Sequence, residues 1–463
     1  MATLQEIFSI GNAGINAGRS LASLAAFNIA NAQTPGFARR VPNFQAGGAA
    51  GLGVIVGPAQ TIRNTVLARS LMSGQSRLGF HEGQLAALQV AETALNDLDG
   101  SGVSVAFTAF TQALKDLSVT PAGSAERQGV IGAAKSLATV FATTSAQLGD
   151  ATRAALGQAR DTADAVNTAT QQIADLNARI RSNVGSSEDL VGLVDQREAL
   201  LTSLSSDVEI QVVRQADGDV RVFTAGGRPL VTGAGASTLE VATTGTPPDY
   251  SIGVSITKPS GETVSSIAPL GGRLGGLINA NNDQLGPAQA RLDEIAFAYV
   301  QAFNTQHQSG TTPDGQPGGP FFTPLTSAVG AAGRIQVSES IVADPSLIAT
   351  GGATSSGPTD NANVLALLGI PDQEGVMADG ASVLQAYDTL VFTMARSINN
   401  ADTGAAIEEA SVSQVESLIA SESGVNTDDE LQRVAQAEVA LQASATVAQR
   451  ADAMTSALLD MLG

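Results

Sequence analysis

The first and last segments of this chain carry apolar side chains at heptad spacing, although almost the whole sequence separates them. In residues 4–29 apolar and small side chains recur at alternating steps of four and three residues, and residues 437–461 repeat the pattern. Such spacing places each set on one stripe of a helix, which is stable only when another surface covers it. The simplest partner for each stripe is the other stripe, or the same stripe on another copy. This pattern is typical of proteins that assemble.

The larger apolar side chains of these two segments are the predicted subunit-interface residues. They are Leu4, Phe8, Ile15, Leu21, Ile29, Val434, Leu441, Val447, Met454, Leu458 and Met461. The first segment also carries Gly11, Gly14 and Gly18, which would let another helix approach closely. One alternative stays open at this point, namely that the two stripes form an ordinary intramolecular core.

Composition narrows the class of function. The net charge is −20 and the 24 Lys and Arg residues are scattered, whereas phosphate binding needs clustered cations, so we expect no nucleic-acid partner. The absence of Cys excludes disulfides, thiolate catalysis and Cys-ligated metals. An aromatic content of 4% with 49 glycines favours close helix packing over deep ligand pockets. No apolar run reaches the roughly 20 residues that span a bilayer, so we expect no membrane insertion.

Residues 30–32 read Ala-Asn-Ala, which looks like a signal-peptide cleavage site. The preceding segment lacks the features of a signal peptide, because its first eight residues contain Glu6 and no basic residue. Asn12, Asn16 and Arg19 also interrupt the apolar stretch. We therefore expect a secreted form of the protein to keep this segment.

Helical periodicity governs most of the chain. We expect helices over about 4–32, 64–98, 103–118, 124–182, 186–206, from the glycines at 271–276 to about 309, 380–400, 403–423, and from Thr427 onward. Pro35-Gly36 forces a turn after the first helix, and Gly286-Pro287 should kink or divide a later one. Thr427 with Glu430 three residues later predicts a capping box.

The period changes from helical to two at Asp207. Val208, Ile210 and Val212 alternate with polar residues, and Asp217-Gly218 is a hairpin signal. Further strands fit at about 220–222, 228–232, 237–242, 250–258 and 262–268, with shorter extended segments within 41–62 and 337–348.

These elements predict a mainly α protein with an inserted β domain, in a nested architecture. Residues 1–36 plus 427–463 would form a terminal coiled-coil domain. Residues 37–206 plus 273–426 would form a helical-bundle body with loops, and residues 207–272 a small outer β-rich domain.

Side chains suited to catalysis are sparse. His81 and His307 are the only histidines, they lie far from each other in sequence, and we interpret both as structural. Asp195 and Arg197 would point to different faces of one helix and pair with neighbouring helices. The acidic run at 428–430 fits the positive end of a helix dipole. We predict no catalytic, metal-binding or cofactor-binding residues, and no enzyme.

Four motifs carry a resemblance to a known family. Asn28-Ile29-Ala30-Asn31, followed by Thr34-Pro35-Gly36-Phe37 and Arg39, resembles the N-terminal pattern of flagellar rod, hook and hook-associated proteins. Three stretches narrow this resemblance to the family of hook-associated protein 1, the first hook–filament junction protein. They are LVDQREALL at 193–201, AFAYVQAFNTQH at 296–307 and SGVNTDDE at 423–430.

The resemblance covers nearly the whole chain, with two departures. Phe37 stands where Tyr is common, and an outer insertion that some members carry near 310–375 should be reduced here. The resemblance implies an extracellular structural adaptor between hook and filament, exported unfolded by the flagellar type III pathway. Its implied partners are other copies of itself, the hook protein, the second hook–filament junction protein and an export chaperone that binds the C-terminal helix.

Two alternatives remain at the level of sequence. A sibling axial protein, of the hook or the distal rod, would share the terminal helices but not the motifs at 193–201 and 296–307. A cell-wall hydrolase carried on a flagellar scaffold would need a convergent acid–base or nucleophilic site, and the sequence shows none.

Overall fold

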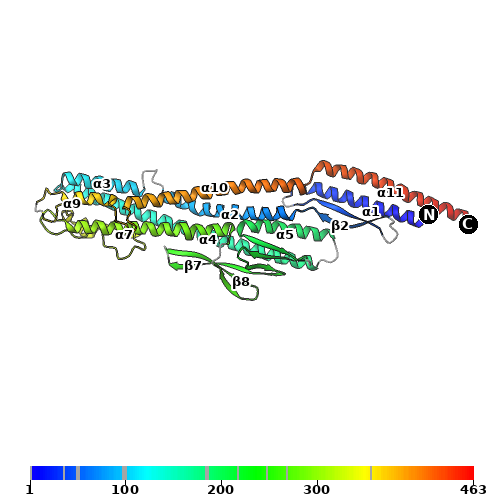
Figure 1. Ribbon diagram of the computed structural model, residues 1–463, viewed down its shortest axis with the longest axis horizontal. Helices are drawn as coiled ribbons and strands as arrows, with labels where there is room; N and C mark the ends of the chain where they lie inside the picture. Colours follow the sequence, from blue (N-terminus) through cyan, green and yellow to red (C-terminus); the bar gives the residue numbers. More distant parts are fainter. Residues whose placement is uncertain are drawn as a thin grey trace.

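The computed structural model is an elongated, mainly helical molecule whose two termini lie together at one end (Figure 1). The structure describes residues 3–34, 37–47, 53–95, 102–182, 187–215, 218–246, 249–266, 270–354 and 357–462. The predicted turn at Pro35-Gly36 lies outside these residues. A mainly α fold with an inserted β region is confirmed.

Helices make up the long body and its extension. The α-helices are α1 Leu4–Ala30, α2 Thr65–Ala94, α3 Val103–Val119, α4 Ser124–Ser182, α5 Ser187–Asp207, α6 Gly272–Asn279, α7 Gly286–Ser309, α8 Glu339–Ala343, α9 Ala362–Gly369, α10 Val383–Ser423 and α11 Thr427–Leu462. The segment η1 Ala280–Leu285 is a π-helix, and η2 Ala332–Arg334, η3 Pro345–Leu347 and η4 Ile370–Asp372 are 3₁₀ turns.

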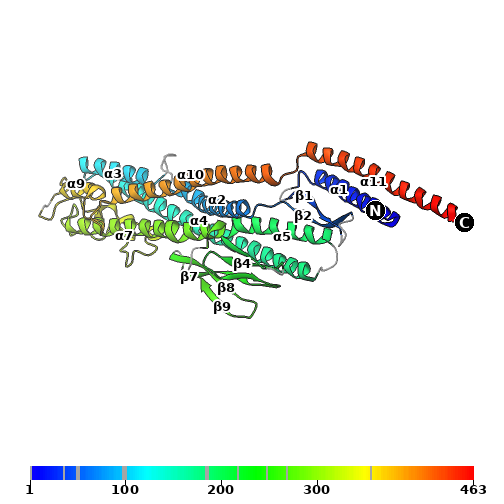
Figure 2. The ribbon, with the colours of Figure 1, turned by 45° about the vertical axis from the view of Figure 1, so that its right-hand side comes forward.

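Three antiparallel sheets are described. Strands β1 Arg40–Ala46 and β2 Val54–Thr61 form a hairpin beside α1 (Figure 2). Strands β3 Ile210–Arg214, β4 Val220–Thr224, β5 Pro229–Thr232 and β6 Gly235–Ala236 pair in chain order. Strands β7 Thr238–Thr246, β8 Asp249–Thr257 and β9 Thr263–Ser266 form the third sheet. All strands from β3 to β9 fall within the segment predicted to be β-rich.

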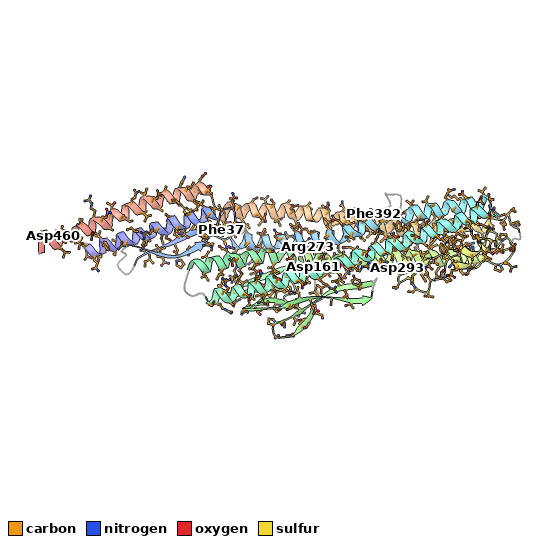
Figure 3. All side chains as sticks on the ribbon, turned by 180° about the vertical axis from the view of Figure 1, so that it is seen from behind. Phe37, Asp161, Arg273, Asp293, Phe392 and Asp460 are labelled. Carbon is orange, nitrogen blue, oxygen red and sulfur yellow. The ribbon has the colours of Figure 1, made fainter. Side chains whose placement is uncertain are left out.

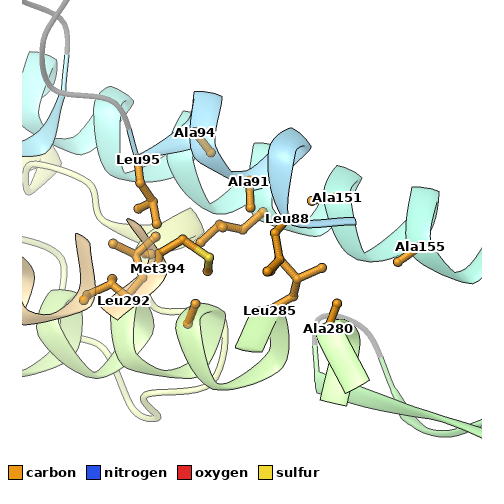
Figure 4. Close-up of a cluster of buried hydrophobic side chains, with 14 of the residues drawn as sticks. Leu88, Ala91, Ala94, Leu95, Ala151, Ala155, Ala280, Leu285, Leu292 and Met394 are labelled. Carbon is orange, nitrogen blue, oxygen red and sulfur yellow. The ribbon is translucent and has the colours of Figure 1, made fainter. Parts of the chain in front are cut away.

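The core lies along the bundle of α2, α4, α6, α7 and α10. Figure 4 shows Leu88 of α2 and Met394 of α10 meeting Leu285 and Leu292 across this bundle. Leu285 is the last residue of the π-helix, so the irregular turn lies just before the predicted break at Gly286-Pro287. A second set of buried side chains is aromatic and joins α3, α4 and α7 to the loop after α7: Phe107, Phe110, Phe141, Tyr299, Phe303, Phe321 and Phe322.

Two predictions about the body are wrong. Residues 383–423 form one 41-residue helix, α10, not two. Gly404 lies inside it, and a Cβ there would come within 2.6 Å of the His81 ring, so this glycine marks close packing against α2 rather than a break. Residues 337–348 form the short helix α8 and a 3₁₀ turn rather than a strand, with an isolated bridge from Val337 to Phe322.

Candidate assembly interface

The two terminal helices, α1 and α11, pack against each other as a terminal pair that extends from one end of the body (Figures 1 and 2). Three glycines on α1 allow a close approach. A Cβ built at Gly14 would lie 2.3 Å from Ser444 Oγ, and one at Gly18 would lie 2.8 Å from Leu441 Cγ. Residues later in α1 contact residues earlier in α11, so the two helices are antiparallel.

The predicted interface residues divide into two groups. Leu4, Ile15, Leu21, Ile29, Val434 and Leu441 are half-buried. Leu441 packs on Gly18 within the same chain, so at this position the stripe of one terminal helix covers the stripe of the other. The other five side chains are exposed: Phe8 by 45%, Val447 by 40%, Met454 by 56%, Leu458 by 46% and Met461 by 83%.

The β1–β2 hairpin beside α1 also carries exposed apolar side chains, which sequence reasoning did not include. Phe44 is 44% exposed and Ile55 is 51% exposed, on strands that pack beside α1. Gly53, with a φ of +90°, lies at the end of the hairpin and packs closely on α1. A Cβ built at Gly53 would lie 3.1 Å from Ala13 Cβ. The alternation of apolar residues around Val54 was the available signal, but it does not show which helix the hairpin would join.

Asn28 stands at the joint between the terminal pair and the body. Its side chain is fully buried, and its amide donates to Arg40 O at 2.9 Å while its oxygen accepts from Arg40 N at 2.9 Å. The same amide donates to Glu430 Oε2 at 3.1 Å. Asn28 therefore joins α1, the hairpin and α11 through one side chain. Asn31 ends α1, and its amide donates to Phe27 O.

The side chain of Arg40 continues this contact into the body. Its guanidinium lies 4.2 Å from the centre of the Phe27 ring and 5.7 Å from that of Phe37. It also pairs with Asp195 of α5 at 3.1 Å, and Arg63 pairs with the other oxygen of Asp195 at 2.6 Å. Asp195 therefore has a structural role, but its partners lie on β1 and in the loop before α2 rather than on neighbouring helices as predicted. This carboxylate ties the joint to the body. Figure 3 shows Phe37 near this joint and Asp460 toward the far tip of the terminal pair.

The predicted capping box at the start of α11 is wrong. Asn426 supplies the cap, since its Oδ1 accepts from Asp428 N at 2.9 Å. Glu430 is 1% exposed and turns inward, where it accepts from Asn28 and, at 2.7 Å, from Arg433. A local capping pattern cannot reveal this, because the competing partner is 402 residues away in sequence.

Arg197 lies on another face of α5, as predicted. It is 5% exposed and donates to Asn177 Oδ1 at 2.9 Å and to Gly218 O at 2.8 Å. Burial lowers the pKa of Arg197, although arginine remains charged in proteins. Arg197 therefore connects α5 to α4 and to the β region, and its neighbours give it a structural role.

A groove of about 640 Å³ lies where the terminal pair meets the body. Leu71 and Met72 of α2, Ile419 of α10 and small residues of α5 line it. Among the described residues no group of three or more His, Asp or Glu side chains could hold a metal ion. The described helices also include none that is long and apolar enough to cross a membrane.

The two histidines lie in the body, away from the terminal pair. His81 flanks the close contact between α2 and α10 at Gly404. His307 is fully buried at the end of α7, where its Nδ1 lies 2.7 Å from Gly319 O and its Nε2 accepts from Ala349 N at 3.0 Å. This is a neutral imidazole that joins α7 to two loop segments.

Acid should weaken the segments that His307 joins. Burial lowers the pKa of His307 from 6.5 to about 4; the hydrogen bond to Gly319 O opposes this change, and the positive charge of Arg127 adds a smaller lowering. Between pH 6.5 and 4, His307 is protonated in the unfolded chain but stays neutral in the folded chain. The free energy of unfolding is therefore highest above pH 6.5 and falls as the pH approaches 4. The loss is about 3 kcal/mol for a shift of this size. Unfolding of the His307→Gln variant across pH 4–7 should lack this component, whereas His81→Gln should keep it; equal pH profiles for the two variants would contradict the assignment.

The fold and this surface define a class of protein: an elongated helical molecule with an inserted β region and a terminal pair that leaves apolar side chains uncovered. The family model described as the flagellar hook-associated protein FlgK helical domain matches residues 88–322. The chain therefore belongs to the FlgK family, and the resemblance stated from the sequence is confirmed.

Individual relatives agree over nearly the full length. Flagellar hook-associated protein 1 of Bacillus subtilis is 26% identical, over 97% of this chain and 96% of the relative. Its counterpart from Escherichia coli is 24% identical, over 99% of this chain and 100% of the relative. A solved structure, the flagellar hook junction protein FlgK from Burkholderia pseudomallei, matches with a TM-score of 0.65 and 17% identity, over 76% of this chain and 99% of that one.

Proposed function

We propose that this protein is a structural adaptor that joins hook to filament in the bacterial flagellum, outside the cell. The names of the relatives and of the similar solved structure support this role. The observation that carries it is the uncovered apolar surface of the terminal pair, on Phe8, Val447, Met454, Leu458 and Met461. Soluble proteins rarely leave such side chains grouped on one element unless a partner covers them.

Polymerisation through the terminal pair follows from this surface. The pair closes on small residues and on Leu441, whereas Met454, Leu458 and Met461 toward the end of α11 stay exposed, where a neighbouring copy would bury them. We infer a ring or tube of copies, with the hook protein on one side and the second hook–filament junction protein on the other. The outer β region hangs from the side of the body, whereas the terminal pair extends from its end (Figure 1).

Export is a further part of the proposal. The chain would leave the cell unfolded through the flagellar type III pathway, with a cytoplasmic chaperone that covers the C-terminal helix. Exposed side chains such as Leu459 and Met461 at the end of α11 would otherwise favour premature association. Removal of a signal peptide after Ala32 would delete all of α1, and with it the partner of α11, so we propose that this segment is retained.

The double variant Leu458→Asp, Met461→Asp tests the interface directly. Both side chains are exposed in the single chain, so the monomer should fold unchanged, whereas assembly should lose two apolar contacts and gain buried charges. Each lost contact is worth about 1.5–3 kcal/mol, so incorporation should fall more than about 100-fold. The measurement is the amount of protein in sheared flagella, with its position at the junction checked by immunolabelling.

The matched control is Gln449→Asp, Ser456→Asp, which adds the same charges at exposed polar positions of α11. This control should incorporate normally. Normal incorporation of the Leu458, Met461 variant would show that the exposed stripe is not the assembly surface. Labelling along the hook or at the base of the flagellum, in place of the junction, would favour a sibling axial protein.

A further inference from the structure

In the part of the chain that the structure describes, five asparagines on helices make the same contact with extended segments. In each case the side-chain amide donates to the carbonyl of one residue and accepts from the N–H of that same residue. The pairs are Asn28 with Arg40, Asn167 with Leu239, Asn177 with Val220, Asn282 with Ile252 and Asn304 with Phe322. The helices that carry them are α1, α4, η1 and α7.

The geometry of these pairs matches that of a neighbouring strand. Along an extended strand the N–H and C=O of one residue point to the same side, where an adjacent strand would exchange both hydrogen bonds. A primary amide offers a donor and an acceptor at about the same spacing. Asn282 meets Ile252 at 2.9 and 2.8 Å, and Asn167 meets Leu239 at 2.9 and 2.7 Å.

Three of the pairs lie where the sheets lack a neighbouring strand. β7 is an outer strand of its sheet, and Asn167 meets it at Leu239. β9 pairs with Val254 to Thr257 of β8, and Asn282 meets β8 just before that stretch, at Ile252. β5 pairs with β4 from Val222 on, and Asn177 meets β4 before it, at Val220.

Burial makes these contacts costly to lose. The five partner residues, Arg40, Val220, Leu239, Ile252 and Phe322, are all buried, so their backbone groups have little access to water. A buried peptide group without a partner is strongly disfavoured. Exposed edges of a sheet are also open to pairing with other chains.

The π-helix η1 adds a second contact at β8. Asn281, which is fully buried, donates to Tyr250 O at 3.2 Å, next to the Asn282 contact at Ile252. The wider turn of a π-helix thus brings two consecutive asparagines onto one strand. Irregular turns of this kind frequently mark a functional constraint.

We propose that these five asparagines act as substitutes for a neighbouring strand, and that Asn167, Asn177 and Asn282 set the position of the outer β region on the helical body. Apolar packing alone holds a sheet against a helix without fixing its register along the helix axis. Paired hydrogen bonds to single residues fix it at three points. This inference concerns the outer β region and does not depend on the proposed assembly through the terminal pair.

The variant Asn282→Asp tests the proposal through its pH dependence. The carboxylate keeps an acceptor for Ile252 N, but it loses the donor and places a negative charge beside Ile252 O. Protonation restores a donor, so the pKa of this carboxyl in the folded protein should lie above the ordinary value of about 3.9. The defect should therefore be full at neutral pH and shrink as the pH falls through the folded pKa.

Two further variants complete the design. Asn282→Leu removes donor and acceptor at every pH, and Asn400→Asp places the same charge at an exposed position of α10. The measurements are amide exchange of residues 249–257 at neutral pH and the melting temperature at pH 7 and 4.5, each relative to the parent protein under the same conditions. At pH 7 both Asn282 variants should exchange about tenfold faster than the parent, and Asn400→Asp should not.

At pH 4.5 the difference in melting temperature between Asn282→Asp and the parent should be much smaller than at pH 7. The difference between Asn282→Leu and the parent should be the same at both pH values. Recovery of the aspartate variant alone is the result that the proposal requires. Exchange within about twofold of the parent for both Asn282 variants would overturn it, as would an equal defect of both variants at the two pH values. Either contrary result leaves the proposed role of the terminal pair intact, because these variants do not touch α1 or α11.

Discussion

Replacing Gly14 with Val should separate α1 from α11 and leave the body folded. A Cβ at this position already lies 2.3 Å from Ser444 Oγ and 3.0 Å from Ser444 Cβ. Rotation of the hydroxyl relieves the first contact but not the second, and Val adds two more methyl groups. Overpacking of this kind costs about 1–3 kcal/mol. Because helices in isolation are marginally stable, the loss should expose both terminal segments.

Limited proteolysis and amide exchange measure this separation. Cleavage within residues 3–34 and 427–462 should rise at least about tenfold, which corresponds to about 1.4 kcal/mol, while the body stays protected. Asn16→Val is the control, since it places the same side chain on an exposed position of α1. Equal protection of the two variants would show that the glycine face is not what holds the pair together.

Heptad spacing was sufficient to predict the terminal pair and the stripe that turns inward, but not which large side chains on that stripe the partner helix covers. The spacing favoured large residues, because burial of apolar area is the usual driving force. In the structure the inward face of α1 uses Gly11, Gly14 and Gly18 against Ser444 and its neighbours. Close backbone approach needs the absence of side chains, and the three glycines of α1 were the sequence signal for it. Leu441 packs on Gly18 at this face, whereas Met454, Leu458 and Met461 lie farther along α11 and stay exposed.

The contacts of Asn28 show why the sequence motif that contains it did not reveal its structural role. The pattern around Asn28 was recognisable, but its function comes from Arg40, Glu430 and Asp195, which lie 12, 402 and 167 positions away from it in the sequence. Long-range polar contacts leave no periodic trace along a chain. Local breaks and caps were also misjudged for this reason, since packing against α2 keeps α10 continuous through Gly404.

The second large effect is expected from replacing Arg127, which lies at the end of the body far from the terminal pair. It is 3% exposed at the start of α4, and burial lowers its pKa while Asp344 opposes that change. Its guanidinium donates to Pro121 O at 2.7 Å and to Ile348 O at 2.8 Å, and also to Pro345 O at 3.1 Å. One cation therefore holds the turn before α4 to the loop that follows α8.

Replacing Arg127 with Met should destabilise this end of the molecule by about 3 kcal/mol. Methionine fills much of the volume but leaves Pro121 O and Ile348 O without the guanidinium donor, whereas Pro345 O still accepts from Ile348 N. Each buried acceptor left unsatisfied costs about 1–3 kcal/mol. Relief of the desolvation of a buried cation offsets part of that sum. Chemical denaturation, together with amide exchange of residues 345–350, measures the loss and shows where it occurs.

Arg153→Met provides the comparison on the same helix, because its side chain is 65% exposed and its ion pair with Asp150 is a surface pair worth little. That variant should stay within about 0.5 kcal/mol of the parent. Arg127→Lys separates charge from geometry: a lysine keeps the cation but cannot reach carbonyls on both sides at once, so its loss should fall between the other two. If Lys restored full stability, charge alone would hold the loop, and the planar fork of the guanidinium would not be what joins the two segments.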